Sequence, residues 1–204
     1  MPNKFPMHKA HPWHGITPGP ECPEIVTCFI EIVPGDTVKY EIDKESGYLK
    51  IDRPQLYSNV APLLYGFVPQ TYCGKEVANL AGVDKGDGDP LDIVVLCERP
   101  IPHGDIILRA IPVGGLRMID KGEADDKIIA VLVGDAAYGY IKSIEDIPPM
   151  LLSRLRHYFM TYKLSPESGV TPVEIACEYG KAEAHLVIEA SRRDYQAFIS
   201  KNAK

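Results

Sequence analysis

The segment KGDGDPLD, residues 85–92, limits local structure more than any other stretch of this chain. Three aspartates, Asp87, Asp89 and Asp92, lie within six positions, and Gly88 and Pro90 interrupt them. A proline inside a helix removes a backbone hydrogen bond and clashes with the preceding turn, so an ordinary helix is excluded here. Carboxylates this close repel one another. The pattern indicates a site for a hard cation, because Mg²⁺ and Ca²⁺ take oxygen ligands and remove the repulsion.

Two familiar interpretations of such an acidic loop do not fit. An EF-hand loop needs an oxygen ligand at its fifth position and glycine at its sixth, where this chain has Leu91 and Asp92. A phosphatase that forms an aspartyl-phosphate would have its acidic pair directly after an apolar strand, whereas AGVDKG precedes this loop. A solvated surface turn stays open as an alternative from this stretch alone.

A second acidic segment, residues 120–127, strengthens the cation interpretation. It carries the four carboxylates Asp120, Glu123, Asp125 and Asp126, and Lys127 follows them. The predicted strand 37–43 adds Lys39 and Glu41 on one face, and no histidine or cysteine ligand lies near either loop. Many carboxylates with interleaved lysines, arginines and tyrosines match several Mg²⁺ ions and a phosphate substrate.

Composition sets the class of protein. The 204 residues are 45% hydrophobic and 25% charged, which suits one globular domain with a sizeable core. The net charge of −6 argues against nucleic acid as the main partner, and no apolar run approaches a membrane span of about 20 residues. Five scattered cysteines without a CxxC motif, and a start without an apolar secretory stretch, predict a reduced cytoplasmic location.

Hydrophobic periodicity predicts strands first and helices last. Residues 1–20 are expected to be an irregular extension rich in Pro, His and Gly, and residues 54–72 to be loop-like. The predicted strands are 24–33, 37–43, 48–53, 91–97, 105–113 and 127–133, and the predicted helices are about 148–163 and 181–201. Strands 37–43 and 48–53 are expected to form a hairpin. This order predicts an α+β fold, with a single domain at 21–204 built as a small β-barrel with flanking helices.

Several blocks together resemble soluble family I inorganic pyrophosphatases. They are KYEIDKESG (39–47), IDRP (51–54), YGF (65–67), GDGDPLDIVV (86–95), DKGEADDK (120–127) and HYFMTYK (157–163). The resemblance covers roughly residues 24–165, and the blocks occur in the order of the family. It implies a five-stranded β-barrel of the OB type, several Mg²⁺ ions per active site, and hydrolysis of pyrophosphate to two orthophosphates by a metal-activated water. It also implies a homo-oligomer, with a hexamer favoured and a dimer possible.

The resemblance also implies a role for each site residue. Asp87, Asp92, Asp120 and Asp125 would be direct Mg²⁺ ligands, and Glu31 and Glu41 would act mostly through metal-bound waters. Asp89 would be the general base, since a base should contact the nucleophile without being used as a ligand. The residues that would hold the phosphoryl groups are Lys39, Arg53, Tyr65, Lys127, Tyr162 and Lys163.

Other interpretations of single residues stay open in the sequence. Tyr65 and Tyr162 could be core aromatics, and Arg53 could simply pair with Asp52 or Asp43. Glu123 and Asp126 are expected to be solvated neighbours of the site rather than ligands. Ala61 stands where many family members carry a second tyrosine, so that contact is expected to be absent.

Two other functions compete with pyrophosphate hydrolysis. A Mg²⁺ phosphatase acting on esters or nucleotides would need a pocket for the organic group, and no aromatic or Gly-rich segment clearly supplies one. A metal- or oligonucleotide-binding barrel module would be expected to have a basic face with stacking aromatics, whereas these loops are acidic.

Overall fold

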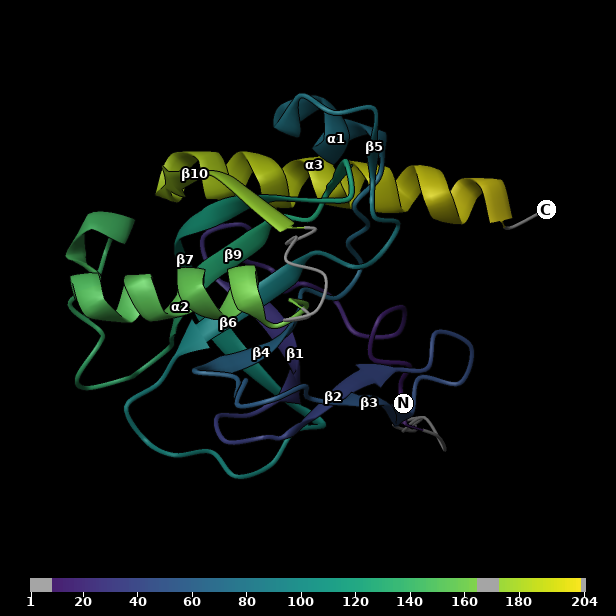
Figure 1. Cartoon of the computed structure of the whole chain (residues 1–204). Helices are drawn as coiled ribbons and strands as arrows, with labels where there is room; N and C mark the ends of the chain where they lie inside the picture. Colours follow the sequence, from purple (N-terminus) through teal and green to yellow (C-terminus); the bar gives the residue numbers. More distant parts are fainter. Residues whose placement is uncertain (1–8, 165–172, 203–204) are drawn as a thin grey trace, which may run out of the picture.

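A closed ring of five strands forms the centre of this α+β fold (Figure 1). The computed structural model describes residues 9–164 and 173–202. The ring runs from β1 (Val26–Ile32) to β4 (Leu64–Phe67), β6 (Asp92–Leu96), β9 (Lys127–Leu132) and β7 (Ile106–Asp120). It closes because β7 also pairs with β1, with Val26 opposite Ala110 and Ile30 opposite Ile106.

The remaining strands extend or flank this ring. β10 (Val173–Gly180) pairs with the long strand β7, and the short strands β5 (Lys85–Gly86) and β8 (Glu123–Ala124) pair with each other. β2 (Val38–Ile42) and β3 (Leu49–Pro54) form a separate two-stranded sheet. The predicted hairpin is therefore confirmed.

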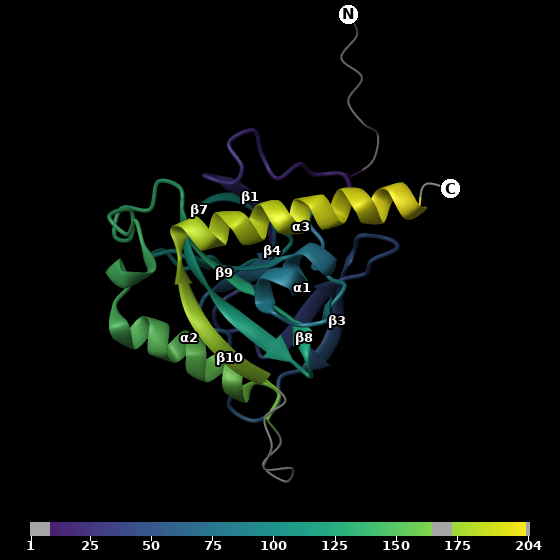
Figure 2. The same cartoon turned by 90° about the horizontal axis from the view of Figure 1, so that it is seen from above.

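Helices cover two sides of the strands (Figures 1 and 2). α3 (Lys181–Asn202) lies across β7 and β10 with the short helix α1 (Lys75–Ala81) beside it, while α2 (Pro149–Thr161) packs near β10. A 3-10 turn, Ile144–Asp146, precedes α2. Both predicted helices are confirmed within two residues at each end. Among the described helices, none is long and apolar enough to cross a membrane.

The prediction that residues 54–72 are all loop-like was wrong, because β4 lies in this stretch and is a central strand of the ring. Its LYGF sequence is short and flanked by prolines, so neither alternation nor length identified it. Gly66 permits its close pairing with β1, since a Cβ at this position would lie 1.9 Å from the carbonyl oxygen of Phe29. Tertiary packing thus determines a strand that local propensity does not show.

Other elements also differ from the prediction. β7 continues to Asp120, beyond the predicted end at residue 113, because its second half pairs with β10, β8 and β9. Helix α1 and strand β5 lie in the weakly periodic stretch 74–86. β10 was not predicted at all.

Parallel pairing brings the two acidic loops together. β6 and β9 run parallel, and their register places Asp92 opposite Lys127, where both strands begin. The loops that lead into these strands therefore meet at the same end of the sheet. The β5–β8 pairing joins them further upstream, with Gly86 opposite Ala124.

A buried carboxylate on α3 caps helix α1. The Asp194 side chain accepts hydrogen bonds from the backbone N–H groups of Gly74, Glu76 and Val77 at 3.0–3.1 Å. The first N–H groups of a helix have no partner within the helix, so a carboxylate from elsewhere can replace the usual N-cap side chain. Asp194 thereby attaches the segment before the aspartate loop, residues 85–92, to the C-terminal helix.

We expect Asp194→Ala to lower the free energy of unfolding by about 2 kcal/mol, because three N–H groups at the start of α1 lose a charged acceptor. Chemical denaturation monitored by circular dichroism would measure the loss. Gln196→Ala, at an exposed position of the same helix, is the control and should change stability by less than about 0.5 kcal/mol. An equal loss in both variants would contradict the capping role.

Candidate active site

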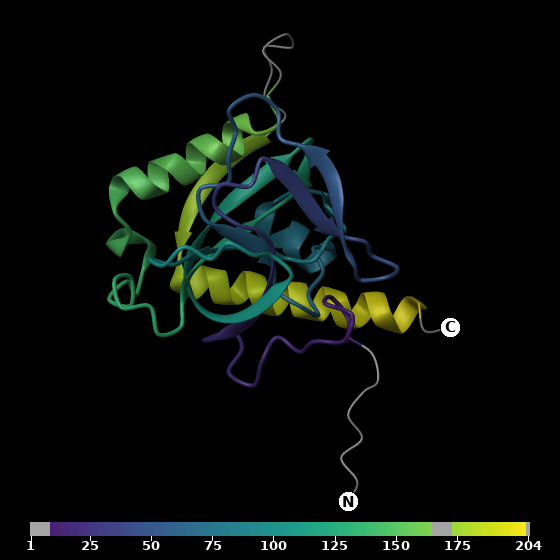
Figure 3. The same ribbon diagram turned by 90° about the horizontal axis from the view of Figure 1, so that it is seen from below.

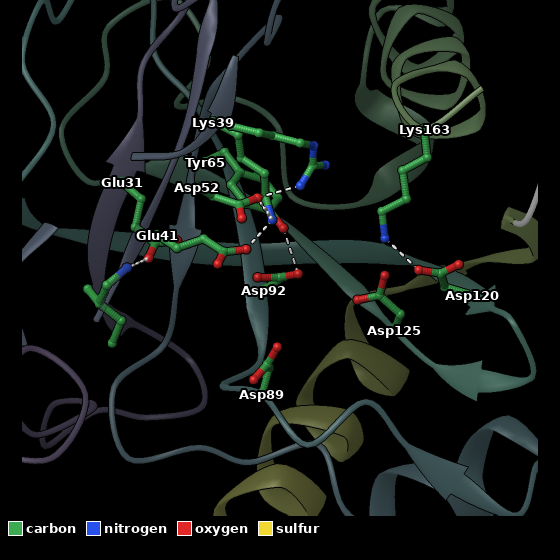
Figure 4. A network of polar contacts seen from close by, with 12 residues as sticks. Glu31, Lys39, Glu41, Asp52, Tyr65, Asp89, Asp92, Asp120, Asp125 and Lys163 are labelled. Atoms are coloured by element: carbon green, nitrogen blue, oxygen red, sulfur yellow. Dashed lines mark hydrogen bonds and ion pairs between the residues drawn. The ribbon is translucent and has the colours of Figure 1, made fainter. Parts of the chain in front are cut away.

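A cavity of about 300 Å³ opens where the two acidic loops meet the β2–β3 sheet. Its volume is at the small end of the range for small-molecule sites. β2, β4, β6, the β7–β9 connection and the C-terminal end of α2 all contribute side chains (Figure 4). The residues come from separate parts of the chain, so the cavity exists only in the folded protein.

All of the site residues named from the sequence, apart from Arg53, line this cavity. They are Glu31, Lys39, Glu41, Tyr65, Asp87, Asp89, Asp92, Asp120, Asp125, Lys127, Tyr162 and Lys163. Arg53 instead pairs with Asp52, which also lies 3.5 Å from the Lys39 ammonium. Two further charged residues line the cavity without a role assigned from the sequence, Lys44 and Glu123.

Asp92 is the centre of a hydrogen-bonded network. The Tyr65 hydroxyl donates to its Oδ2 at 2.6 Å, and the buried Lys127 ammonium donates to the same oxygen and to Asp125. Burial, and next the negative charge of Asp92, raise the pKa of Tyr65 well above its ordinary value. The phenol therefore stays protonated and acts as a donor in this network.

Lys127 keeps its charge although it is buried. Burial alone would lower the pKa of this ammonium, but the carboxylates of Asp125 and Asp92 outweigh burial and raise that pKa well above the usual value. Lys127 is thus a fixed positive charge between two acidic side chains.

The aspartate loop is built around Asp87. Its Oδ1 accepts the backbone N–H of Asp89 at 3.0 Å, and its own N–H donates to the carbonyl of Ala124 in the second acidic loop at 3.2 Å. Burial, followed by the charge of Asp125, raises the pKa of Asp87 to about 9. Without bound cations, the site therefore disfavours the ionised form of Asp87 beside the Asp125 carboxylate.

Glu31 lies buried on the opposite side of the cavity. Its Oε1 accepts the backbone N–H of Ile42 at 2.7 Å, which connects β1 to the β2–β3 sheet. Burial is the largest influence on this carboxyl and raises its pKa to about 8, with Asp92 and Glu41 acting in the same direction.

Two lysines at the cavity edge also pair with acidic residues. Lys39 donates to Glu41 on the same strand, and Lys163 donates to Asp120, as Figure 4 shows. Asp120 keeps one buried oxygen, Oδ1, without a hydrogen-bond partner among the described residues. An acceptor in this condition is available to a cation.

The prediction that Asp126 is solvated was wrong. This residue is 1% exposed, and the Arg117 guanidinium on β7 lies 3.5 Å from its Oδ1. Successive residues of an extended segment point to opposite sides, so Asp125 faces the cavity while Asp126 faces the interior. Its neighbour Glu123 lines the cavity and pairs with Lys85.

The donor set fits divalent cations. Eight carboxylates and four lysines line the cavity, all cation ligands among the charged groups are oxygens, and no histidine or cysteine is present among the lining residues. Within the described part of the chain, no three acidic, His or Cys side chains are already gathered closely enough to hold an ion. Lysines lie against the acidic groups instead, and Lys127 contacts both Asp92 and Asp125. Cations would replace these contacts and release the ammonium groups.

Comparisons by family model, by sequence and by structure all match inorganic pyrophosphatases. A family model described as inorganic pyrophosphatase matches residues 28–196. An inorganic pyrophosphatase of Chlamydia muridarum is 49% identical over 203 residues, which cover 95% of this chain and 97% of the relative. A crystal structure of inorganic pyrophosphatase from Thermus thermophilus superposes with a TM-score of 0.79 at 28% identity, covering 92% of this chain and 99% of that one.

A type I inorganic pyrophosphatase structure from P. falciparum superposes with a TM-score of 0.82 at 27% identity. It covers 96% of this chain and 67% of its own. The fold and the acidic, lysine-lined cavity define a phosphate-handling hydrolase. This chain belongs to the inorganic pyrophosphatase family.

Tyr65 on β4 reaches the cavity, whereas Ala61 is buried in the apolar core beside α2. Removing a neutral hydrogen-bond donor costs about 0.5–1.5 kcal/mol. We therefore expect Tyr65→Phe to lower kcat/KM for pyrophosphate by roughly 2- to 12-fold. Steady-state kinetics would measure the change, with Tyr57→Phe at an exposed position as the control. Kinetics identical to the unsubstituted protein would show that Tyr65 only packs.

Proposed function

We propose that this protein hydrolyses inorganic pyrophosphate to two orthophosphates in a Mg²⁺-dependent reaction. The observation that carries the proposal is the charge of the cavity in a member of this family. With every carboxyl ionised, eight carboxylates face four lysines, which leaves four excess negative charges. Pyrophosphate carries up to four negative charges itself, so it cannot enter without cations. Two or more divalent cations would balance the excess.

Six acidic residues would hold the ions. Asp87, Asp92, Asp120 and Asp125 line the cavity from the two acidic loops and would be direct ligands. Glu31 and Glu41, across the cavity, would act mostly through waters. Bound Mg²⁺ would neutralise phosphoryl oxygens and lower the pKa of a coordinated water.

The side chains of the cavity would supply the rest of the chemistry. Asp89 would accept a proton from the attacking water as general base. Lys127 and Lys163, released from their acidic partners, would bind phosphoryl oxygens and stabilise charge on the leaving phosphate. Lys39, Tyr65 and Tyr162 would hold the substrate in line with the base. Arg53 would join them from the rim, through its link to Asp52 and Lys39.

Three further features belong to this proposal. The ring of five strands would be an OB-type barrel. The protein would work in the cytoplasm. It would do so as a homo-oligomer, a hexamer rather than a dimer.

A phosphate-release assay tests the function. Purified protein would be offered pyrophosphate, ATP and a simple phosphomonoester, each with millimolar Mg²⁺ and with chelator. We expect fast release from pyrophosphate with Mg²⁺, far slower release from ATP and the monoester, and none with chelator. Ca²⁺ should occupy the sites but support little turnover, because the larger ion polarises water less.

The alternatives predict different outcomes in the same assay. Preferential release from ATP or the monoester would support the phosphatase alternative. No release from pyrophosphate at any Mg²⁺ concentration would remove the proposed function.

A further inference from the structure

Lys44 lines the cavity but has no role in the mechanism above. It lies on the turn between β2 and β3, and its ammonium pairs with the Asp89 carboxylate. The Lys44 and Asp89 side chains are 58% and 47% exposed. An ion pair this exposed stabilises a fold by no more than about 1 kcal/mol. A large effect of removing Lys44 would therefore arise in the site and not in folding.

The partner of Lys44 distinguishes it from the other cavity lysines. Lys127 and Lys163 pair with proposed direct cation ligands, Asp92, Asp125 and Asp120. Lys39 pairs with Glu41, which would act through a metal-bound water. Those contacts must weaken when cations bind. Asp89 is the carboxylate that the mechanism keeps off the cations, so its pairing with Lys44 can persist throughout the reaction.

We propose that Lys44 is a positioning residue for Asp89, holding this carboxylate toward the attacking water. The inference rests on the proposed function, in which Asp89 is the base. The surroundings of Asp89 are otherwise acidic, with Asp87 accepting its backbone N–H at 3.0 Å and Asp92 in the same loop. Because Asp89 is not a proposed cation ligand, the Lys44 ammonium is the positive group that contacts this carboxylate directly.

The N-terminal segment fixes the turn that carries Lys44. His11 Nε2 contacts the Lys44 carbonyl at 3.2 Å, while His11 Nδ1 accepts the backbone N–H of Trp13 at 3.1 Å. A carbonyl can only accept and an N–H can only donate, so both contacts require the Nε2–H tautomer of His11. Gly47 in the same turn has φ +73°, and a Cβ there would lie 2.8 Å from the His11 ring.

The same segment is attached to the aspartate loop. The buried Trp13 indole donates to the Thr71 carbonyl at 2.8 Å, and the Thr71 hydroxyl accepts the N–H of Leu91, within that loop, at 2.8 Å. Trp13 also packs against Phe198 of α3, and Figure 3 shows the N-terminal segment running beside that helix. His11 therefore contacts the turn that carries Lys44, and Trp13 is linked through Thr71 to the loop that carries Asp89.

A double-mutant cycle tests the proposal. Lys44→Met, Asp89→Asn and the double variant would be assayed for pyrophosphate hydrolysis at saturating Mg²⁺. We expect Lys44→Met to lower kcat about 3- to 10-fold, the size of one lost hydrogen bond, with KM changed less than about 2-fold. In the Asp89→Asn background the same substitution should have no further effect, because the group it positions is gone. Lys44→Arg should restore most of kcat.

A matched control comes from the same hairpin. Lys50 is 52% exposed, pairs with Asp43 and does not line the cavity, so Lys50→Met should leave kcat and KM unchanged. His11→Ala should lower kcat in the same direction as Lys44→Met, by less, and should add nothing to it.

Three results would overturn the positioning role. One is an unchanged kcat in Lys44→Met. Another is a loss of equal size with Asp89 present or replaced, and the third is a rise in KM at constant kcat, which would show direct substrate binding. An unsubstituted protein that does not hydrolyse pyrophosphate would remove the proposed function first, and this inference with it.

Discussion

Replacing Asp89 with asparagine is expected to lower kcat for pyrophosphate by roughly 10²–10⁴, the usual contribution of a general base. The amide has nearly the same shape but cannot take a proton at neutral pH. Within the described residues, the Asp89 carboxylate accepts a hydrogen bond from the Lys44 ammonium alone, so the variant should fold normally. Its Mg²⁺ affinity should stay within a few-fold of the unsubstituted protein, since Asp89 is not a proposed ligand.

Asp92→Asn is the matched comparison, three residues further along the same loop. Asp92 accepts hydrogen bonds from both Tyr65 and Lys127 and is a proposed cation ligand. This variant should lose most activity and need much more Mg²⁺ to regain any. Calorimetric Mg²⁺ titration together with kcat at saturating Mg²⁺ separates the two roles. If Asp89→Asn abolished Mg²⁺ binding at ordinary concentrations, the assignment of base and ligand would be reversed.

Arg117→Met is expected to cost about 3 kcal/mol of the free energy of unfolding, because it leaves the buried Asp126 carboxylate without its cation. Arg117 lies 3.5 Å from Asp126 and 2.8 Å from Glu183, and its guanidinium stacks on Tyr179 at 5.2 Å from the ring centre. Denaturant unfolding would measure the loss. Glu183→Gln, which removes the half-exposed partner, should cost less than about 1 kcal/mol.

The destabilisation by Arg117→Met should depend on pH. Burial already raises the pKa of Asp126 to about 6, and Arg117 acts against that rise. Without Arg117 the pKa rises further, so the folded protein holds a proton that the unfolded chain has released. A carboxyl whose pKa is raised on folding loses stability as pH increases. The deficit relative to the unsubstituted protein should therefore be larger at pH 8 than at pH 5.

A second substitution would check the cause. Adding Asp126→Leu to Arg117→Met removes the buried charge and should restore much of the stability, since an apolar pair can replace a buried ion pair. A pH-independent loss, or a double variant as unstable as Arg117→Met, would show that packing of the arginine and not the charge pair stabilises this region.

Much of the local structure could be predicted because it depends on local patterns. The alternation of residues 38–42 predicted β2, the apolar runs predicted β6 and β9, and the spacing of Leu151, Leu155 and Phe159 predicted α2. β4 and β10 were not predicted, because each is a strand only through its neighbours. β4 needs Gly66 against β1, and β10 needs the second half of β7.

The same division holds for the candidate site. Residue types in the two acidic loops, together with Lys39 and Glu41, led to the prediction of cations and a phosphate substrate. The structure gathers these residues around one cavity, and the cations stay a prediction. Sequence patterns could not show that Asp126 turns inward to Arg117, since an acidic residue beside two site residues looks solvated. They also could not show that Lys44 reaches Asp89 across 45 positions of the chain.

The sequence by itself determined that the site offers carboxylates, lysines and tyrosines, because charge, hydrogen-bonding capacity and ligand preference belong to the side chains. Only the tertiary structure decided which charges face one another. The parallel register of β6 and β9 places Asp92 beside Lys127 and brings the two loops together. The HPWHG segment, residues 11–15, has no role that sequence patterns assign, but in the structure its His11 contacts the turn that carries Lys44. Such contacts depend on strand register and chain crossing, which are set by burial of the whole core and not by any local stretch.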